Sequence, residues 1–197
     1  MSHQQSPAIS DALGMGDHAA YFFRDNHERL AFAVPYIVTG LRNRERCVYI
    51  ADENTVSQML AEFQRAGVDI GRATSTGALS VVTKQETYLR HGIFEPEQMI
   101  SDLDRDVRFA LHRGFSGLRV TGEMSWALDL PSAVGRLCQY EQELSSRWPF
   151  QLGGLCQYNE TLFPKDVVDR MTACHCVVVR NGQVIRHHVH DCAAAAA

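Results

Sequence analysis

The chain has 197 residues, of which 45% are hydrophobic and 21% are charged, a balance typical of one globular domain with a full core. Its formal net charge of -4 argues against a dedicated nucleic-acid surface, because phosphate binding depends on clustered lysine and arginine. No apolar run approaches the roughly 20 residues of a membrane helix, and residues 1–15 lack the pattern of a secretory signal, so we expect a cytoplasmic protein without a membrane or direct nucleic-acid partner.

Short apolar runs alternate with stretches of helical spacing in the first half of the chain. These patterns predict strands at 19–23, 46–51 and 79–83, a helix at 26–40, a second helix after residue 54 and a short helical stretch near residue 70. Asp25 or Asn26 is a suitable N-cap for the first helix, and Pro35 inside that helix predicts a kink or a break. Residues 84–94 mix polar and aromatic groups, and a loop of this kind after a strand is a candidate lid.

The second half of the chain continues the same alternation. The predicted elements are helices at 96–113, 130–147 and 164–173, and strands at 118–121, 151–156, 176–179 and 183–188. Asn181-Gly182 is the strongest hairpin turn in the chain, so the last strand should return antiparallel at a sheet edge. The sequence therefore predicts a three-layer α/β fold, a mostly parallel sheet with helices on both faces. We expect a flexible arm over residues 1–15, a single domain over residues 16–190 and a tail over residues 191–197.

The most unusual cluster of side chains follows the predicted strand at 118–121, which has a glycine on each side. Glu123, Met124 and Trp126 come directly after this strand. In open α/β sheets, ligands bind in the crevice beyond the carboxyl ends of the strands, so a carboxylate and an indole at this place predict a pocket wall. The alternative is that Trp126 belongs to the core and that Glu123 caps the next helix, and these residues alone leave both interpretations open.

Unusual side chains near the ends of the other strands extend this candidate site. Cys156 and Tyr158 end the strand at 151–156, His18 precedes the first strand, and His175 introduces the strand at 176–179 from what should be the opposite end of the sheet. An apolar surface with a few polar groups is the usual composition of a small-molecule site. The candidate ligand-binding residues are Tyr21, Met124, Trp126 and Tyr158 as apolar contacts, and His18, Arg119, Glu123, Cys156 and His175 as polar groups.

Several kinds of site are disfavoured by what the sequence lacks. After Phe23 the chain reads Arg-Asp-Asn-His-Glu-Arg-Leu, with neither the glycines nor the lysine of a phosphate-binding loop, so ATP or dinucleotide binding of the usual kind is disfavoured. Cys174 and Cys176 would share one face of a strand, but no second cysteine pair at ligand spacing completes a zinc site, and we predict no metal site there. A cysteine-dependent hydrolase is an alternative that the sequence leaves open. It would use Cys156 as nucleophile, His175 or His18 as base and Glu123 as the orienting group.

A set of motifs spread over residues 14–180 resembles the MEDS domain, the sensory domain named after methanogens, methylotrophs and the dichloromethane-responsive regulator DcmR. The motifs are Gly16-Asp17-His18, Arg46 to Asp52, Thr87-Tyr88 with Gly92 and Phe94, Gly117 to Met124 with Trp126, Tyr140-Glu141, Cys156-Gln157-Tyr158 and Phe163-Pro164. The resemblance implies a RecA/KaiC-like domain that has lost its nucleotide-binding loop, which agrees with the missing phosphate motif. One departure is Ala173-Cys174-His175-Cys176, where family members often read Thr-His-Pro, and the extra thiols leave a redox or metal sensitivity open.

The resemblance also implies a function. It predicts a non-enzymatic sensory domain that binds a small organic, hydrocarbon-like ligand and regulates a signalling partner: a histidine kinase, an anti-sigma factor or a transcription regulator. RecA-like relatives favour a homodimer, and no cofactor is identified. No output motif is found in the sequence, so the signal is expected to pass to another chain or another part of the protein. Two alternatives stay open, namely the cysteine-dependent hydrolase and a degenerate RecA-like interaction module without a ligand.

Overall fold

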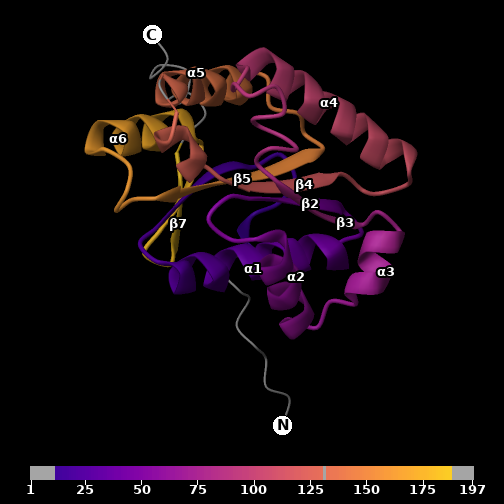
Figure 1. Ribbon diagram of the computed structural model, residues 1–197. Helices are drawn as coiled ribbons and strands as arrows, with labels where there is room; N and C mark the ends of the chain where they lie inside the picture. Colours follow the sequence, from indigo (N-terminus) through magenta and orange to yellow (C-terminus); the bar gives the residue numbers. More distant parts are fainter. Residues whose placement is uncertain (1–11, 131, 188–197) are drawn as a thin grey trace.

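The protein is built on a seven-stranded sheet, which the computed structural model describes within residues 12–130 and 132–187 (Figure 1). The strands are β1 (His18–Phe23), β2 (Arg46–Ala51), β3 (Leu79–Thr83), β4 (Leu118–Glu123), β5 (Leu152–Asn159), β6 (Val177–Arg180) and β7 (Gln183–Arg186). Their order in the sheet is β3-β2-β4-β5-β1-β6-β7, and every neighbouring pair is parallel except β6 and β7. The predicted α/β fold with an antiparallel C-terminal pair is confirmed.

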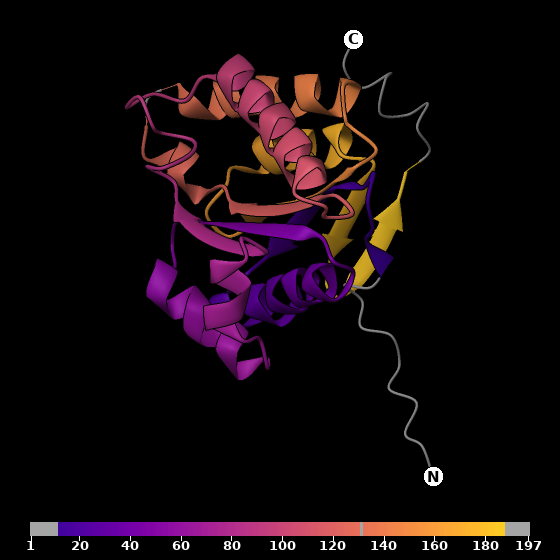
Figure 2. The same cartoon turned by 90° about the vertical axis from the view of Figure 1, so that its right-hand side faces the viewer.

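Helices cover both faces of this sheet and divide the core into two halves. The helices are α1 (Asn26–Arg42), α2 (Val56–Arg65), α3 (Ile70–Ser75), α4 (Pro96–His112), α5 (Ala133–Ser146) and α6 (Lys165–Cys174). The first three pack on one face, here called the α1 face, and the last three on the opposite face, here called the α5 face (Figures 1 and 2). None of the helices in the described part of the chain is both long and apolar enough to cross a bilayer.

Alternation along the strands decides which side chains reach which face. In β1, Ala19, Tyr21 and Phe23 join the core of the α1 face, whereas Ala20 and Phe22 join the core of the α5 face. By the same alternation, His18 at the start of β1 lies on the α5 face. The two faces therefore receive different candidate residues from the same strand.

Two central strands extend beyond their predicted ends. The pattern predicted that the fourth strand would stop at residue 121 and the fifth at residue 156, but β4 continues to Glu123 and β5 to Asn159. The two strands pair in parallel along this extension, with Gly122 opposite Cys156 and Glu123 opposite Gln157. Cys156 is thus an interior residue of β5, and Glu123 is the last residue of β4 and not a residue of the loop beyond it.

Local signals positioned the remaining elements well. The Asp25 side chain accepts a hydrogen bond from the Glu28 backbone N–H at 2.8 Å and caps α1, which continues past Pro35 to Arg42. Asn181 and Gly182 have φ values of 51° and 69°, the left-handed conformation that a tight hairpin requires between β6 and β7. Residues 1–11 of the expected arm, residue 188 of the expected last strand and the expected tail lie outside the described residues.

Candidate functional site

Four side chains of the kinds that bind metals converge on the α5 face of the sheet. They are His18 of β1, Glu141 of α5, Cys156 of β5 and His175 in the connection between α6 and β6. One nitrogen, oxygen or sulfur atom of each residue lies within 4.8 Å of the corresponding atom of every other residue. All four residues are buried, and Glu141 and His175 have no exposed surface.

Strand pairing and helix packing bring these residues together. β1 lies between β5 and β6, and Ala20 of β1 pairs with Cys156 of β5. His18 lies two residues before Ala20 and therefore on the same face. Glu141 stands on the buried stripe of α5, between Leu137 and Leu144, and its carboxylate faces the sheet. The site thus depends on contacts between elements that are more than 100 residues apart in the chain.

The Glu141 carboxylate is the centre of the cluster. Its Oε1 accepts a hydrogen bond from the Tyr158 hydroxyl at 2.6 Å. Its Oε2 lies 3.1 Å from Nε2 of His18, 3.4 Å from Nε2 of His175 and 3.7 Å from Sγ of Cys156. The same sulfur lies 3.6 Å from Nε2 of His18. Both imidazole rings therefore present their Nε2 atoms to one carboxylate oxygen.

Neighbouring oxygen atoms decide which ring nitrogen of each neutral histidine carries the proton. Nδ1 of His175 lies 2.7 Å from the backbone oxygen of Met171, which can only accept, so Nδ1 is the donor. The Ser145 hydroxyl donates to the backbone oxygen of Cys174 at 2.6 Å and lies 3.0 Å from Nδ1 of His18. Because its one proton is already donated, Ser145 accepts from Nδ1 of His18. In both neutral rings, Nε2 then faces Glu141 as a lone pair.

Burial and mutual charge shift the pKa values of these groups. Burial, together with the neighbouring His175, lowers the pKa of His18 to about 4. Burial opposes protonation of His175 as well, but Cys174 and Glu141 outweigh it and hold the pKa of His175 well above its ordinary value. Although burial works to raise the pKa of Glu141, His175 and His18 lower it. Without another cation, the cluster is therefore a buried His175–Glu141 ion pair beside a neutral His18.

Cys156 is poorly suited to act as a nucleophile in this setting. Burial raises the pKa of its thiol to about 12, and the Glu141 carboxylate adds to the shift. A nucleophilic cysteine requires the thiolate, which an adjacent positive charge normally favours. The hydrolase alternative also required Glu123 as orienting group, but Glu123 makes its contacts elsewhere, and the acid beside Cys156 is Glu141. This arrangement disfavours covalent catalysis by Cys156.

A small cavity of about 20 Å³ adjoins the cluster at Cys156. It is lined by Tyr88, Met99, Leu103, Val120, Thr121, Gly122, Met124, Tyr140, Leu144, Trp148, Gly154, Leu155 and Cys156. Trp148 also stacks on the ring of His18, with 4.1 Å between the ring centroids. Most of the lining is apolar and comes from β4, β5, α4 and α5, while Tyr88 comes from the segment at 84–94. The cavity is thus a short apolar space that ends at a polar cluster.

Six of the nine predicted ligand-binding residues lie on this side of the sheet. His18, Cys156, Tyr158 and His175 belong to the cluster or contact it, and Met124 lines the cavity. Trp126 has no exposed surface and stacks on Tyr88, with 5.0 Å between the ring centroids. Trp126 therefore supports the cavity from behind Tyr88 and belongs to the core, as the second interpretation of this residue predicted.

Tyr21 and Arg119 make their contacts on the α1 face instead. The Tyr21 hydroxyl donates to the backbone oxygen of Glu28 at 2.5 Å. Arg119 has no exposed surface, forms an ion pair with Glu45 and lies over the Tyr36 ring at 4.4 Å from its centroid. Both polar groups are satisfied within the protein, and the sheet separates them from the cavity.

Glu123 is likewise held by contacts within the protein. Its Oε1 accepts a hydrogen bond from the Tyr49 hydroxyl at 2.7 Å. Its Oε2 accepts from the backbone N–H groups of residues 52–54, at 3.0, 2.5 and 3.2 Å, and lies 3.0 Å from Nη1 of Arg29. The carboxylate therefore organises the loop between β2 and α2, and neither interpretation from the sequence had included this contact.

The sequence profile of one family, described as "MEDS: MEthanogen/methylotroph, DcmR Sensory domain", matches residues 17–176. The chain belongs to the MEDS family. The matched range contains all four cluster residues and the whole segment at 84–94. The predicted family is thereby confirmed, and membership implies a sensory or signalling role for the protein.

Solved structures show which fold this MEDS domain shares with other proteins. A KaiC-like protein from the hyperthermophilic archaeon Pyrococcus horikoshii OT3 superimposes with a TM-score of 0.57 at 15% identity, covering 84% of this chain and 71% of the other. An uncharacterized protein from Pyrococcus horikoshii, solved in complex with an unknown peptide, gives a TM-score of 0.64 at 13% identity, covering 84% and 77%. At this identity the likeness shows the KaiC-like fold alone. Among curated proteins, no sequence matches this chain.

Glu141 and Tyr88 are among the site residues that were not predicted as ligand-binding residues of this MEDS domain. Glu141 appeared only as part of a family motif, although a carboxylate on the buried stripe of an otherwise apolar helix face is itself a signal. Tyr88 was placed in the candidate lid, but its ring is 5% exposed and reaches the cavity. The burial of the Tyr88 side chain could not be inferred from the composition of residues 84–94, because the aromatic residues of such a mixed loop can be either exposed or buried.

Proposed function

We propose that this MEDS domain is a non-enzymatic sensor that binds a small, uncharged organic molecule in the cavity beside Cys156 and regulates a separate signalling partner. The observation that carries the proposal is the cavity itself, with an apolar wall, one polar end and a closing side chain from a loop. Such a combination of apolar surface and few polar groups is the usual composition of a small-molecule site. Family membership supports a sensory role for it.

The place where KaiC-like folds would hold a nucleotide is unsuitable for phosphate. The connection between β1 and α1 contains Asp25, which caps the helix, and Glu28 lies in the first turn. A phosphate at a helix N-terminus needs free backbone N–H groups, but here a carboxylate already accepts from one of them. The exposed Arg24 of this connection is already paired with Glu28 and Glu160. An uncharged ligand on the α5 face is therefore favoured over a nucleotide on this edge.

Binding of an organic molecule requires movement of the cavity wall. A cavity of about 20 Å³ has room for roughly one water molecule, which is less than a ligand of several heavy atoms needs. Two lining residues stand on irregular segments, Tyr88 in the loop after β3 and Trp148 between α5 and β5, and Trp148 is held by a hydrogen bond from its Nε1 to the Leu152 backbone oxygen and by stacking on His18. We therefore expect Tyr88 to move when the ligand enters.

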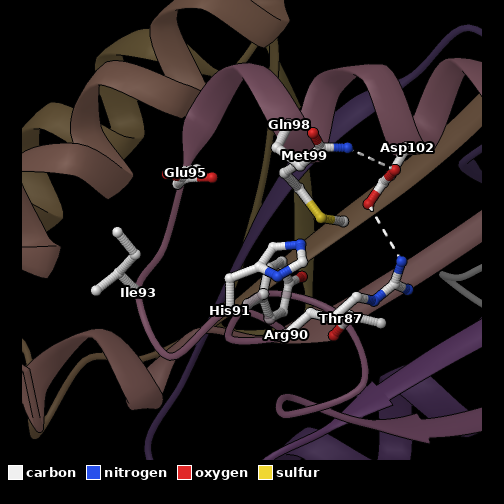
Figure 3. A pocket seen from close by; sticks show the side chains of 9 residues that line it. Thr87, Arg90, His91, Ile93, Glu95, Gln98, Met99 and Asp102 are labelled. Carbon is white, nitrogen blue, oxygen red and sulfur yellow. Dashed lines mark hydrogen bonds and ion pairs between the residues drawn. The ribbon is translucent and has the colours of Figure 1, made fainter.

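The segment at 84–94 connects Tyr88 to the molecular surface. Figure 3 shows its outer side, where Arg90 faces Asp102 of α4 at 3.8 Å and Ile93 points away from the ion pair. Ile93 is 51% exposed, although Phe94 beside it is buried. A ligand shifts a conformational equilibrium only through its different affinity for two states. Displacement of Tyr88 supplies this difference, and the outer side of the segment is the surface that a histidine kinase, an anti-sigma factor or a transcription regulator would contact.

A ligand screen by thermal unfolding tests the proposal. Millimolar short-chain alcohols, ketones and halomethanes would be compared with Mg-ATP on the full chain and on Val120→Leu, which adds one methylene to the cavity wall. A bound ligand stabilises the folded state by mass action, so we expect at least one uncharged compound to raise the Tm of the wild type, to raise that of Val120→Leu less, and to change hydrogen exchange at residues 84–94. Stabilisation by Mg-ATP, or no response to any compound, would contradict the proposal.

A further inference from the structure

We infer that His18, Glu141, Cys156 and His175 form a binding site for a divalent transition-metal ion, with Zn²⁺ the best match to their geometry. The inference goes beyond the proposed sensor function and does not depend on it. Zn²⁺ takes imidazole nitrogen, thiolate sulfur and carboxylate oxygen as ligands and is almost always tetrahedral in structural sites. The cluster contains two nitrogen donors, one sulfur donor and one oxygen donor.

The distances between the donor atoms agree with such a tetrahedron. With metal–ligand bonds of about 2.0–2.3 Å, ligand atoms around Zn²⁺ lie about 3.3–3.8 Å from each other. Four pairs in the cluster lie close to this range: 3.1 Å from His18 Nε2 to Glu141 Oε2, 3.4 Å from His175 Nε2 to Glu141 Oε2, and 3.6 and 3.7 Å from Cys156 Sγ to His18 and Glu141. The largest separation is within 4.8 Å. Small side-chain movements would therefore complete the coordination.

In the neutral rings, the pattern of protons leaves both Nε2 atoms as lone pairs that need a cation or a donor. Nδ1 of each histidine is occupied by an oxygen acceptor, so the Nε2 lone pairs of His18 and His175 face the Glu141 carboxylate. Nε2 of His175 is buried and makes no hydrogen bond among the described residues. Lone pairs that converge in a buried space repel each other unless a cation lies between them. A metal ion at this point would be bound by all four groups at once.

The neighbours of the cluster are those expected around a metal site. Metal-binding histidines usually donate their second N–H to a carbonyl, carboxylate or water, which fixes the tautomer and the ring orientation. His175 donates to a backbone oxygen, His18 donates to Ser145, and the Tyr158 hydroxyl holds the second oxygen of Glu141. Sulfur and imidazole donors disfavour Mg²⁺ and Ca²⁺, which prefer oxygen. The set therefore favours a transition-metal ion, with tetrahedral Zn²⁺ matching the donors and Co²⁺ serving as its spectroscopic substitute.

The alternative cation is a proton on His175, which would form a buried ion pair with Glu141. In that arrangement the Cys156 thiol keeps its proton and donates to Glu141 at 3.7 Å or to His18 Nε2 at 3.6 Å, so no single cation is shared by all four groups. Metal content distinguishes the two cases, because a proton leaves no metal in the purified protein. The site also joins β1, β5, α5 and the α6–β6 connection, so a bound ion would stabilise the contact between them.

The test uses the full chain without an affinity tag that binds metal. Wild-type protein would be purified by ion exchange, analysed for metal by mass spectrometry, and then refolded with Co²⁺ for absorption spectroscopy. We expect about one Zn²⁺ per chain, and after exchange the visible bands of tetrahedral Co²⁺ with a thiolate-to-cobalt charge-transfer band. A wild type that retains no metal and shows no such bands on refolding with Co²⁺ would overturn the inference.

Matched variants assign the ligands. Cys156→Ser should remove the charge-transfer band, and His175→Gln should weaken Co²⁺ binding by more than the 10–100-fold that loss of an outer-shell partner costs. Cys47→Ser removes a buried thiol on the α1 face and His112→Gln a histidine on α4, so neither should change metal content. Circular dichroism identifies any variant that does not fold. If a variant does not fold, the metal content and the Co²⁺ absorption spectrum of the wild type test the inference. Equal metal retention in all four variants would contradict the assignment.

Discussion

Replacement of Glu123 by alanine tests whether this residue is structural or part of a ligand site. The side chain is 1% exposed, and its two oxygens contact Tyr49, Arg29 and the three backbone N–H groups of residues 52–54. Arg29 is also 1% exposed. Removal of the carboxylate therefore takes from Arg29 the nearer of its two carboxylate partners, leaving Glu53 at 3.6 Å, and leaves several backbone donors without their acceptor.

The expected magnitude follows from the contacts that are lost. Removing one partner of a buried ion pair lowers the free energy of unfolding by about 3–5 kcal/mol. Each buried donor left without an acceptor lowers it by about 1–3 kcal/mol more. These terms are not additive, and the 31% exposed side chain of Glu53 shows that solvent lies near the loop. We expect Glu123→Ala to lose about 3–5 kcal/mol, which for a domain of this length lowers the Tm by about 6–20 °C.

Urea denaturation followed by circular dichroism measures this loss. Glu97→Ala is the matched control, because Glu97 lies on α4 with a 72% exposed side chain, pairs with Arg147 at 3.7 Å and should change the free energy of unfolding by less than about 1 kcal/mol. Glu123→Gln keeps the shape of the side chain but loses its charge, so its loss in free energy of unfolding should lie between those of Glu123→Ala and Glu97→Ala. If Glu123→Ala unfolds with the same free energy as Glu97→Ala, the structural role argued here is wrong and a ligand role for Glu123 is favoured.

Three further predictions concern the other buried polar groups and the closing side chain. Arg119→Ala should cost about 3–5 kcal/mol in urea denaturation because it leaves Glu45 buried without its cation, and adding Glu45→Gln should recover most of the loss. Gly122→Ala would place a Cβ 2.1 Å from the Tyr88 hydroxyl, so we expect a loss of about 1–3 kcal/mol and faster hydrogen exchange at residues 84–94, and unchanged exchange would contradict the packing. The pKa of His18 is about 4 in the fold and about 6.5 in the unfolded chain, so protons favour the unfolded state and metal-free protein should lose up to about 3 kcal/mol as the pH falls from 6.5 to 4. His18→Gln should remove this part of the pH dependence, whereas an identical dependence in both proteins would refute it.

Secondary structure could be predicted from the sequence because its signals are local. The apolar runs at 46–51 and 79–83 match β2 and β3 residue for residue, and Asp25 caps α1 as its residue type suggested. The hairpin after β6 followed from Asn181-Gly182, since only a left-handed conformation fits such a turn. The predicted strand ends were less accurate where strand pairing decides them. β4 and β5 extend beyond their predicted ends because the backbone of each strand pairs with that of the other, and their own composition does not indicate this.

The members of the candidate site were decided by tertiary structure. His18, Cys156, Tyr158 and His175 were chosen from the sequence as unusual groups near strand ends, and they meet only because β1 is inserted between β5 and β6. Tyr21 lies on β1 with His18, and Arg119 lies on the neighbouring β4, but alternation directs both to the opposite face.

The sequence by itself determined the elements, the fold class and the absence of a phosphate-binding loop, since all three rest on local patterns of residue type. Strand order and the approach of Glu141 from α5 depend on contacts between segments distant in the chain, such as that of His18 with Glu141 across more than 100 residues, and no local pattern records them. The buried cluster and the place of Tyr88 in the wall of the adjoining cavity therefore became visible only in the folded protein.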